Sequence, residues 1–492
     1  TDLTFTYPGS FDPVFEHVSF QLDTDWRLGL TGRNGRGKTT LLRLLQGQYP
    51  HQGTITAPGG FEYFPYPIPD AGLTPLELLE CSFPDVPQWR LRRELAPLFV
   101  TDDALYRPFS TLSGGEQAKI LLALLFAREG RYLLIDEPTN HLDETGRALV
   151  SRYLAKKSGF LLVSHDRAFL DGCVDHILSI NRGGIEVQKG NFSSWYENRQ
   201  RQDAFELAQN AQLKKEIGRL KQAARQSRAW ADKVESTKIG PHSAKVTGEA
   251  DAMGGRAYIG EQSRRMQQRR KNLERRQNAA IEEKSALLKN IEQAAPLKLH
   301  QLPYHTDRLA LLRDVSVCYG SAPVCRGVSF CVEQGDRIAL RGANGTGKTS
   351  LLRLLCGEDV PHTGTVERSS RLRISYVRQD PSGLRGDLGA YAARYGLDES
   401  LFKAILRKLD FARVQFEKDM ADFSAGQKKK VLLARSLCEP SHLLVWDEPL
   451  NYVDVLSRMQ IEDLLLEFQP TIVFVEHDRV FCDHVATKAV ML

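Results

Sequence analysis

The 492-residue sequence lacks a long hydrophobic run and lacks cysteines at metal-binding spacing. No apolar stretch approaches the roughly 18 residues of a membrane-spanning helix, so we expect no membrane domain. None of the eight cysteines forms a C-x-x-C pair. This argues against structural zinc and iron–sulfur clusters and is typical of reduced thiols in a cytosolic protein. The chain begins at Thr1 rather than Met, so we expect a few residues to precede it, and nothing present resembles a leader.

Residues 197–297 have few aromatic residues and almost no strand-forming pattern. Between 201 and 290, about 20 lysines and arginines stand against about 11 acidic residues, a net charge of roughly +9. The whole chain carries only +5, so the positive charge is concentrated in this segment. We expect a polyanionic partner for it, although a solvated spacer is the simpler interpretation of any charged helix.

Apolar residues in this segment recur at helical spacing. The two series that do so are Leu213, Ile217, Leu220 and Ala224, followed by Met266, Leu273, Ala280 and Leu287. They predict the apolar seams of two long helices of coiled-coil type. The glycine- and proline-containing stretch at about 240–260 predicts the turn between them. The sequence therefore predicts an antiparallel helical hairpin with a shaped tip. A simple spacer would need neither a basic face nor a shaped tip.

A phosphate-binding loop follows the apolar stretch 27–30 and precedes the helical run Thr40–Leu45. It has the G-x-x-x-x-G-K-T pattern and consists of Gly32, Arg33, Asn34, Gly35, Arg36, Gly37, Lys38 and Thr39. Glycines let backbone N–H groups surround phosphate oxygens at a helix start. In this pattern Lys38 reaches the β- and γ-phosphates and Thr39 binds Mg²⁺.

The same pattern recurs 310 residues later, and four other landmarks repeat at nearly the same offset. The second loop consists of Gly342, Ala343, Asn344, Gly345, Thr346, Gly347, Lys348 and Thr349. The repeated landmarks are Tyr7 and Tyr319, Ser113 and Ser424, Asp136 and Asp447, and His165 and His477. One module is therefore present twice, and we expect domains at 1–196, 197–297 and 298–492.

A Ser-Gly-Gly element opens the helix predicted over Ala118–Ala127. In isolation this string is a common turn, but after a P-loop it predicts a second phosphate-binding helix start. The first copy consists of Ser113, Gly114, Gly115 and Glu116, and the second of Ser424, Ala425, Gly426 and Gln427.

Each copy also has a buried strand that ends in two acids, Asp136-Glu137 and Asp447-Glu448. An acidic turn after a strand is frequent, but beside two P-loops the first acid suits the Mg²⁺ shell and the second suits polarising an attacking water. His165 and His477 each follow the next apolar strand. Such a histidine is usually a loop residue, whereas its repetition favours sensing of the γ-phosphate.

The first strand of each module ends near a tyrosine, Tyr7 and Tyr319. An aromatic residue there is more often part of the core. Its repetition favours stacking on adenine.

These motifs together resemble ATP-binding-cassette ATPases, and two cassettes joined by a long basic linker resemble the ABC-F family. The resemblance covers essentially the whole chain, although the linker matches only in length, helicity and charge. It implies an α/β fold with two P-loop ATPase domains that bind ATP and Mg²⁺ head to tail within one monomer. It also implies binding to the bacterial ribosome near the exit tRNA site, with the hairpin pointing to the peptidyl-transferase centre.

The resemblance assigns residues of both cassettes to each ATP site. The first site would join residues of the first cassette to the Ser-Ala-Gly-Gln element of the second cassette. The first-cassette residues are Tyr7, those of the first P-loop, Thr40, Asp136, Glu137 and His165. The other site would join residues of the second cassette to the Ser-Gly-Gly-Glu element of the first cassette. The second-cassette residues are Tyr319, those of the second P-loop, Ser350, Gln379, Asp447, Glu448 and His477. Thr39, Asp136, Thr349, Gln379 and Asp447 would bind Mg²⁺. Glu137, Glu448, His165 and His477 would be catalytic.

The sequence departs from the family pattern in three places. Ala425 replaces a glycine, and Tyr66 stands where Gln379 stands in the second copy, so the two sites need not be equivalent. A phenol cannot replace an amide carbonyl as a metal ligand in the same geometry. The first cassette also has no inserted arm, which resembles family members that confer antibiotic resistance rather than translation factors.

We therefore expect an ATPase that protects the peptidyl-transferase centre from lincosamides, pleuromutilins or streptogramin A, binds 23S rRNA and tRNA, and leaves on hydrolysis. The strongest candidates for RNA contact are Arg264, Arg265, Arg269, Arg270, Arg275 and Arg276, because arginines carry affinity for phosphates. Three alternatives remain open. They are a translation factor that relieves stalled ribosomes, the paired ATPase subunit of an importer, and a DNA-repair ATPase.

Overall fold

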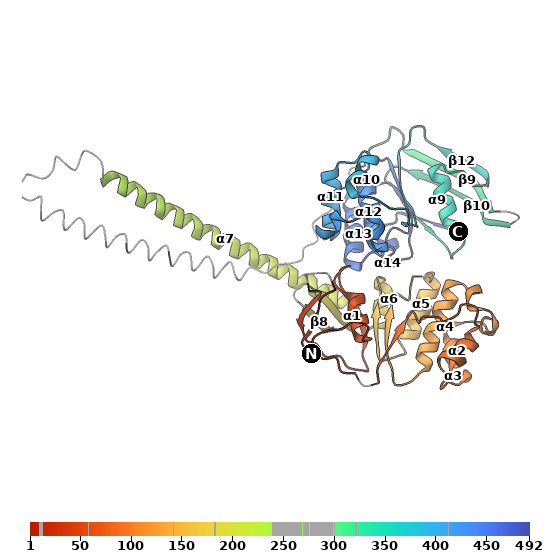
Figure 1. The fold of residues 1–492 in the computed structure, drawn as a ribbon. Helices are drawn as coiled ribbons and strands as arrows, with labels where there is room; N and C mark the ends of the chain where they lie inside the picture. Colours follow the sequence, from red (N-terminus) through yellow and green to blue (C-terminus); the bar gives the residue numbers. More distant parts are fainter. Residues whose placement is uncertain are drawn as a thin grey trace, which may run out of the picture. The chain divides into compact units, whose positions relative to one another are not determined.

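A computed structural model describes residues 1–8, 13–57, 59–140, 142–181, 184–238, 268, 275, 299, 301–319, 322–411 and 413–492. The chain forms two compact units. The first unit comprises Thr1–Trp195 with Ala294–Leu492, and the second comprises Tyr196–Gln293. The first unit contains both predicted cassettes. The bounds of the second unit differ by only a few residues from those of the predicted linker, 197–297 (Figure 1).

The first cassette is built on a six-stranded sheet with the strand order β4-β5-β6-β3-β7-β8. Its strands are β3 (Arg27–Thr31), β4 (Phe61–Phe64), β5 (Tyr132–Asp136), β6 (Phe160–Val163), β7 (His176–Asn181) and β8 (Gly184–Lys189). All neighbours are parallel except β7 and β8. A small antiparallel pair, β1 (Leu3–Phe5) and β2 (Phe15–Val18), precedes the sheet.

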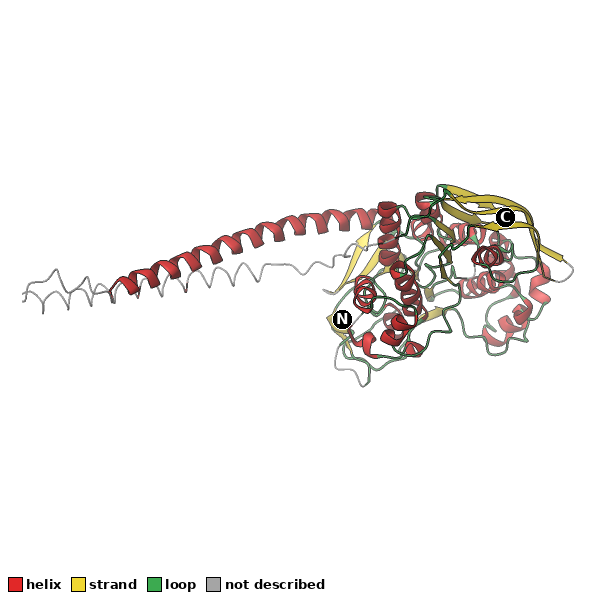
Figure 2. Ribbon diagram, turned by 90° about the horizontal axis from the view of Figure 1, so that it is seen from above, coloured by secondary structure: helices red, strands yellow, loops and turns green. Residues whose placement is uncertain are grey.

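Helices accompany this sheet. They are α1 (Lys38–Leu45), α2 (Pro75–Ser82), α3 (Gln88–Leu95), α4 (Gly114–Ala127), α5 (Glu144–Leu154) and α6 (Arg167–Cys173). Three short 3₁₀ turns, η1 (Ala96–Leu98), η2 (Asp102–Tyr106) and η3 (Phe109–Thr111), connect α3 to α4. Strands and helices alternate along this α/β fold, and Figure 2 distinguishes the helices (red) from the strands (yellow).

The second cassette repeats this architecture. Its parallel sheet has the order β13-β14-β15-β11-β16, formed by β11 (Arg337–Arg341), β13 (Ile374–Val377), β14 (Leu443–Asp447), β15 (Ile472–Val475) and β16 (Lys488–Met491). A three-stranded antiparallel sheet lies beside α9 in Figure 1 and consists of β9 (Arg308–Tyr319), β10 (Ala322–Glu333) and β12 (His362–Arg368). The order of the five strands in the parallel sheet matches β4-β5-β6-β3-β7 of the first cassette, and β8 has no counterpart in that sheet.

The helices of the second cassette follow the same sequence of elements. They are α9 (Lys348–Cys356), α10 (Leu388–Arg394), α11 (Glu399–Lys408), α12 (Ala425–Cys438), α13 (Val455–Phe468) and α14 (Arg479–Val485), with 3₁₀ turns η5 (Arg413–Glu417) and η6 (Met420–Asp422). The predicted fold class of two ATPase domains is therefore confirmed.

The strand order explains why distant motifs meet. The central strands β5, β6 and β3 are neighbours, and their counterparts are β14, β15 and β11. The strands β6, β14 and β15 consist of buried residues throughout, which is typical of parallel strands covered on both faces. Because parallel strands end at one edge of the sheet, the P-loop, the paired acids and the histidine of each copy emerge together.

Two helix starts differ from the prediction. The helix after the first P-loop begins at Lys38, before Thr40, and α4 begins at Gly114, before Ala118. In α4 the reason is a capping box, in which the Ser113 hydroxyl accepts from the Glu116 amide and the Glu116 carboxylate accepts from the Ser113 amide. Glycine therefore serves as the first helical residue. Tyr7 also lies two residues beyond β1, whereas Tyr319 does end β9.

Helix α7 (Phe192–Lys238) supplies the described part of the linker. Its 47 residues correspond to a length of about 70 Å at 1.5 Å per residue. Of the predicted seam residues, Ile217 is buried and Leu213 and Leu220 are half-buried, whereas the side chain of Ala224 lies outside the described residues. Six basic residues are exposed among the described side chains of α7: Arg201, Lys214, Lys215, Arg219, Lys221 and Arg225. One side of the helix is thus apolar and much of the rest is basic.

The second helix of the hairpin and its tip lie outside the described residues. So do the seam residues Met266, Leu273, Ala280 and Leu287, and five of the six candidate RNA-binding arginines (Arg264, Arg265, Arg269, Arg270 and Arg276). Arg275 is described as an exposed helical residue. The hairpin therefore remains a prediction.

No helix among the described residues is long and apolar enough to cross a membrane. All eight cysteines are free thiols. Cys173, Cys325 and Cys482 are buried as expected of core thiols, whereas Cys81 on α2 is exposed.

Candidate nucleotide sites

In each P-loop, the glycine before the lysine is the N-cap residue of the following helix, and the helix has no side-chain cap. Gly37 and Gly347 have φ of 91° and 85°, and no side-chain oxygen bonds to the first turn of α1 or α9. A Cβ at Gly37 would lie 2.7 Å from the Cγ1 of Val14, so the position has neither the backbone conformation nor the space for another residue. The uncapped N–H groups of both helices fit a phosphate group.

The P-loop lysines fold back over their own loops. The Nζ of Lys38 donates to the carbonyl of Gly32 at 2.7 Å and to the Oδ1 of Asn34 at 3.1 Å. The Nζ of Lys348 donates to the carbonyls of Gly342 and Ala343 at 2.8 and 2.7 Å. Burial lowers the pKa of both lysines. A buried ammonium in a ring of carbonyls is well placed to meet a phosphate.

The strand-end aspartate of the second copy fits a magnesium ion. Asp447 is fully buried, and among the described residues its Oδ2 has no hydrogen-bond partner. Its Oδ1 accepts from the hydroxyl of Thr349 at 3.3 Å, and burial raises its pKa to about 6. No cluster of three or more metal-binding side chains occurs in the described part of the chain. Such a cluster is not required for a Mg²⁺ that is bound by one carboxylate, one hydroxyl and phosphate oxygens.

The second acid of each pair lies against its histidine. The Nε2 of His165 is 3.3 Å from the Oε1 of Glu137, and the Nε2 of His477 is 3.2 Å from the Oε1 of Glu448. Both glutamates have a positive φ, 50° and 46°, which is uncommon for a non-glycine residue and can mark a functional constraint. The structure therefore brings together the predicted acid and histidine in both copies.

A pocket of about 510 Å³ lies at the second site, a size within the range of about 300–1,000 Å³ for small-molecule sites. Second-cassette residues that line it include Lys348, Thr349, Gln379, Glu448 and His477. The first cassette contributes residues from its Ser-Gly-Gly element and from the loop before α5, namely Gly114, Asn140 and Leu142. Residues of both cassettes therefore line one pocket.

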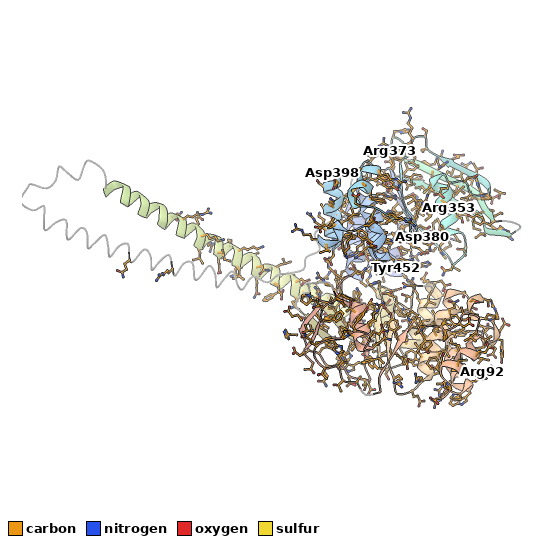
Figure 3. All side chains as sticks on the ribbon, viewed as in Figure 1. Arg92, Arg353, Arg373, Asp380, Asp398 and Tyr452 are labelled. Atoms are coloured by element: carbon orange, nitrogen blue, oxygen red, sulfur yellow. The ribbon has the colours of Figure 1, made fainter. Side chains whose placement is uncertain are left out.

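At the first site the two cassettes touch directly. The Nδ2 of Asn34 donates to the carbonyl of Tyr452 at 2.9 Å (Tyr452 is labelled in Figure 3). Arg36 is 3.9 Å from Asp410. A Cβ on Gly426 would lie 2.4 Å from the Tyr452 carbonyl and 3.1 Å from the Asn34 amide nitrogen. The predicted Gly426 is thus packed against the predicted P-loop residue Asn34.

The Ser-Gly elements are shaped by reciprocal caps. Ser113 and Glu116 form one capping box, and Ser424 and Gln427 form the other. The Oε2 of Glu116 accepts from both the backbone and the hydroxyl of Ser113, which lowers its pKa. Glu116 and Gln427 therefore orient the serines, and their predicted contact with nucleotide remains a prediction.

Tyr7 and Tyr319 occupy equivalent positions. The Tyr7 hydroxyl is 2.6 Å from the hydroxyl of Thr40, and the Tyr319 hydroxyl is 3.1 Å from that of Ser350. Both rings are partly exposed, at 38% and 49%. Each hydroxyl is thus tied to the helix after its P-loop, while the ring keeps surface for stacking on a base.

The two glutamates that the sequence predicts to be catalytic differ in their partners. Glu448 accepts from the amide of Gln379 at 2.8 Å and from the amide of Asn451 at 2.6 Å, in addition to its contact with His477. Burial acts to raise the pKa of Glu448, but the hydrogen bonds from His477 and Gln379 hold it below its ordinary value. Glu448 is therefore a carboxylate near neutral pH.

Glu137 has a poorer set of donors. Its Oε1 is buried without a hydrogen-bond partner among the described residues. Burial and the neighbouring Asp136 raise its pKa to about 8. Tyr66, which replaces the glutamine, packs on the ring of Phe83 at 5.0 Å. Another tyrosine, Tyr63, instead donates to the Oδ2 of Asp136 at 2.9 Å. The geometry therefore favours Glu448, rather than Glu137, as the glutamate that is ionised at neutral pH.

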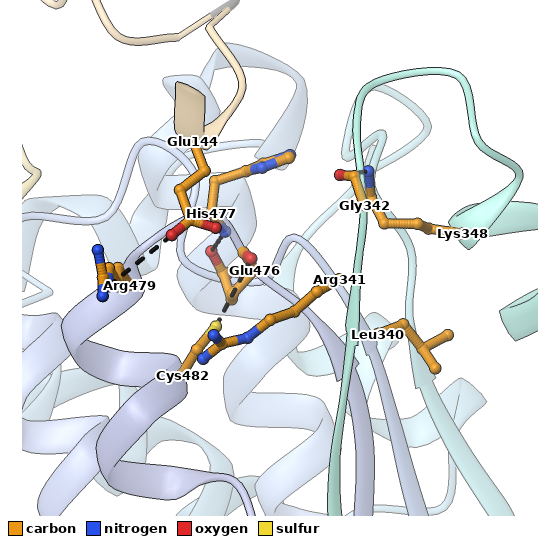
Figure 4. Close-up of a pocket in the computed structure, with 9 residues that line it drawn as sticks. All are labelled: Glu144, Leu340, Arg341, Gly342, Lys348, Glu476, His477, Arg479 and Cys482. Atoms are coloured by element: carbon orange, nitrogen blue, oxygen red, sulfur yellow. Dashed lines mark hydrogen bonds and ion pairs between the residues drawn. The ribbon is translucent and has the colours of Figure 1, made fainter. Parts of the chain in front are cut away.

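A small hollow of about 20 Å³ lies beside the second P-loop, with room for about one water molecule. Figure 4 shows the residues that line it, among them Lys348, His477 and Glu476. Glu144 of the first cassette also lines it and is 3.9 Å from Arg479. The hollow thus adjoins the histidine and the P-loop lysine and includes one acid from the other cassette.

Several residues near these sites were not singled out from the sequence. They are Asn140, Asn451, Tyr452, Lys429, and two arginines, Arg147 and Arg458. Lys429 is fully buried and donates to the carbonyl of Arg378 at 2.9 Å. Arg147 and Arg458 share the repeat offset of about 310 residues. The repeat could therefore have indicated both arginines. Tyr452 could not have been found in this way, because it makes its contact through its backbone carbonyl, which any residue type has.

Comparison with known proteins agrees with this geometry. The family described as ABC transporter matches residues 15–62 and 325–451. The ribosome protection protein VmlR of Bacillus subtilis (strain 168) is 27% identical over 97% of this chain and 84% of its own length. The ATP-binding protein Uup of Caulobacter vibrioides is 29% identical over 98% of this chain and 75% of its own length.

Solved structures show the same fold. The archaeal ribosome recycling factor aABCE1, in complex with a ribosomal stalk protein, superimposes with a TM-score of 0.62 at 18% identity and covers 100% of this chain and 87% of its own. A protein described as RNase-L inhibitor gives a TM-score of 0.58 at 18% identity, with 94% of this chain and 82% of its own covered.

Two P-loop sheets, each with a strand-end Asp-Glu pair and a facing histidine, define a tandem ATP-binding-cassette ATPase. The chain is similar over nearly its whole length to relatives of the ABC-F type, which is a family of such tandem ATPases. The class binds nucleotide, and the residues described above fit Mg²⁺ as its counter-ion.

The different partners of Glu448 and Glu137 can be tested one site at a time. In a Glu137→Gln background, Gln379→Ala removes a donor to Glu448 and should lower the remaining ATP turnover about 10- to 100-fold, the range for losing a supporting hydrogen bond. In a Glu448→Gln background, Tyr66→Ala should change turnover by less than about threefold. Phosphate release measures both. Equal losses in the two backgrounds would contradict the assigned difference.

Proposed function

We propose that the chain uses ATP to bind the bacterial ribosome through its linker and to protect the peptidyl-transferase centre from antibiotics. The partners are 23S rRNA and tRNA, and the drugs are of lincosamide, pleuromutilin or streptogramin A type. The relative named ribosome protection protein supports this proposal, as do the basic charge of the linker and the absence of an inserted arm between Tyr66 and Leu112. A ribosomal partner implies a cytoplasmic location.

The observation that carries the proposal is the sharing of each site between two cassettes. Gly114 of the first cassette lines the pocket that contains Lys348 of the second, and Gly426 of the second packs on Asn34 of the first. A phosphate bound at either P-loop would therefore be contacted from both halves. Nucleotide then favours the closed arrangement, because it interacts better with that state than with the open one.

The side chains suit hydrolysis after closure. Bound ATP with Mg²⁺ would supply the phosphoanhydride bond that is broken and the ion that neutralises phosphate charge. Glu448 holds a carboxylate ready to orient and polarise a water, His477 fixes that carboxylate through its Nε2, and Lys348 offers its ammonium to the phosphates. Loss of the γ-phosphate would remove the contact between the halves and release the protein from its partner.

The linker supports recognition of RNA by charge. The exposed cations of α7 (Arg201, Lys214, Lys215, Arg219, Lys221 and Arg225) lie on one helix. RNA helices offer phosphates and sugar edges rather than readable base patterns, so a basic helix suits them. We propose that the second helix adds the six arginines between 264 and 276 and that residues 240–260 form the tip that acts on drug or tRNA.

Blocking hydrolysis should trap the protein on its partner. Glu137→Gln with Glu448→Gln keeps the P-loops and removes both bases, so ATP-dependent co-sedimentation with purified ribosomes should rise and release should slow at least about tenfold. A matched control replaces two exposed acids, Glu129→Gln with Glu399→Gln, and should behave as the parent. If the double variant at 137 and 448 dissociates as fast as the parent, ATP hydrolysis does not drive release.

Charge reversal should weaken binding through the phosphate backbone. Arg269→Glu with Arg270→Glu should lower affinity for ribosomes and reduce the slope of log affinity against log salt by about one unit for each lost phosphate contact. Arg326→Glu, at an exposed position on β10 of the second cassette, serves as the control. An unchanged slope in the double variant would remove these arginines from the RNA contact.

A measurement of antibiotic resistance distinguishes the proposed ribosome protection from the alternative, a translation factor that relieves stalled ribosomes. Expression of the chain in a susceptible bacterium should raise the inhibitory concentration of at least one of the three drug classes about fourfold or more, and the Glu137→Gln, Glu448→Gln variant should not. Growth in graded drug measures this. If no drug is countered while ribosome binding is intact, the translation-factor alternative is favoured.

A further inference from the structure

Two arginines occupy equivalent positions beside the nucleotide sites. Arg147 lies on α5 and Arg458 on α13, in each case four residues after an aspartate that caps the helix, Asp143 and Asp454. The Nε of each arginine donates to a carbonyl of the preceding loop, Leu142 at 3.1 Å and Val453 at 2.9 Å. Both guanidinium groups are thus held in the same orientation within their own cassettes.

Each arginine also faces the aspartate that follows its cassette's histidine. The NH1 of Arg147 is 3.0 Å from the Oδ2 of Asp166, and the NH1 of Arg458 is 3.7 Å from the Oδ2 of Asp478. The other oxygen of each aspartate caps a helix start through the amide of Phe169 or Phe481. The guanidinium is therefore linked to the loop that carries the catalytic histidine.

Arg147 reaches further than its counterpart. Its NH1 also donates to the backbone carbonyl of His477, in the other cassette, at 3.3 Å. A continuous path thus runs from Glu137 and His165 through Asp166 and Arg147 to His477 and then to Glu448. The side chains of Arg147 and Asp166 are only 11% and 6% exposed, so water screens this contact little.

A second buried contact holds the same loop. Arg167, next to Asp166, pairs with Glu462 of the second cassette at 2.5 Å, with both side chains below 10% exposed. The counterpart of Arg167 is Arg479, which is 69% exposed and lies 3.9 Å from Glu144. A dashed line marks this contact in Figure 4. The loop after β6 is therefore anchored across the cassettes more firmly than the loop after β15.

We propose that Arg147 is a positioning residue that couples the two nucleotide sites, because its guanidinium joins the Asp166 carboxylate beside one catalytic histidine to the backbone carbonyl of the other. A shift of the His477 loop when nucleotide engages the second site is transmitted to Asp166 and His165 at the first site. By thermodynamic linkage the same coupling acts in the opposite direction. This inference concerns the ATPase itself and is independent of the ribosomal role proposed above.

The coupling can be measured without turnover. In the Glu137→Gln, Glu448→Gln protein, a fluorescent ATP analogue with Mg²⁺ is titrated to obtain its dissociation constant at the second site. Lys38→Ala then disables the first site, and the titration is repeated. The ratio of the two constants is the coupling factor, which we expect to exceed about fivefold, the lower end for coupled sites.

The same pair of titrations with Arg147→Met forms a double-mutant cycle. We expect the coupling factor to fall below about twofold while the melting temperature and the affinity for a single nucleotide stay near those of the parent. Arg152→Met, an exposed arginine on the same helix, is the matched control and should leave the factor unchanged. If Arg147→Met does not fold, Arg147→Lys keeps the charge beside Asp166 and should still lose the contact with His477.

Three results would overturn the proposal. They are a coupling factor that persists in the Arg147 variants, an equal loss in Arg152→Met, and the absence of coupling in the parent. Each leaves the assignment of the ATP sites intact, because that assignment is read from the loss of binding in Lys38→Ala and Lys348→Ala themselves.

Discussion

The first amide groups of α1 and α9 lack a side-chain cap, and this constraint organises the whole molecule. Gly37 and Gly347 leave those amides facing a loop closed over by its own lysine. An anion is the natural partner of such a helix start. The glycines of α4 and α12 belong to the opposite cassettes, so an anion bound in either loop would be contacted from both halves. Under the proposed function, nucleotide binding therefore favours the joining of the cassettes.

The duplication is close in architecture and unequal in chemistry. Gln379 supports Glu448, whereas Tyr66 at the equivalent position packs on Phe83. Glu462 bridges to the first cassette, whereas Ser151 stands at its counterpart position. Because buried polar groups are costly without partners, such single replacements change what each site can hold and how firmly it is anchored. Two sites with different bases can share the work of closure and hydrolysis unequally.

The long helix α7 fits a role that depends on charge and reach. Its exposed lysines and arginines extend along a helix of about 70 Å, and its seam residue Ile217 is buried. A basic helix of this kind recognises a phosphate backbone rather than a base sequence. ATP-dependent closure would then control when the charge is presented, which is the physical link between the cassettes and the proposed ribosomal function.

The sequence alone determined the duplicated cassette, the two P-loops, the strand-end acids and their histidines, because those elements depend on local patterns that repeat at one offset. It also indicated a basic helical linker from periodicity and charge. Only the tertiary structure decided which donors reach Glu137 and Glu448, that Tyr63 rather than Tyr66 contacts a strand-end acid, and that Arg147 binds the carbonyl of His477. Contacts between side chains and backbone atoms some 300 residues apart arise from packing, and no local pattern encodes them.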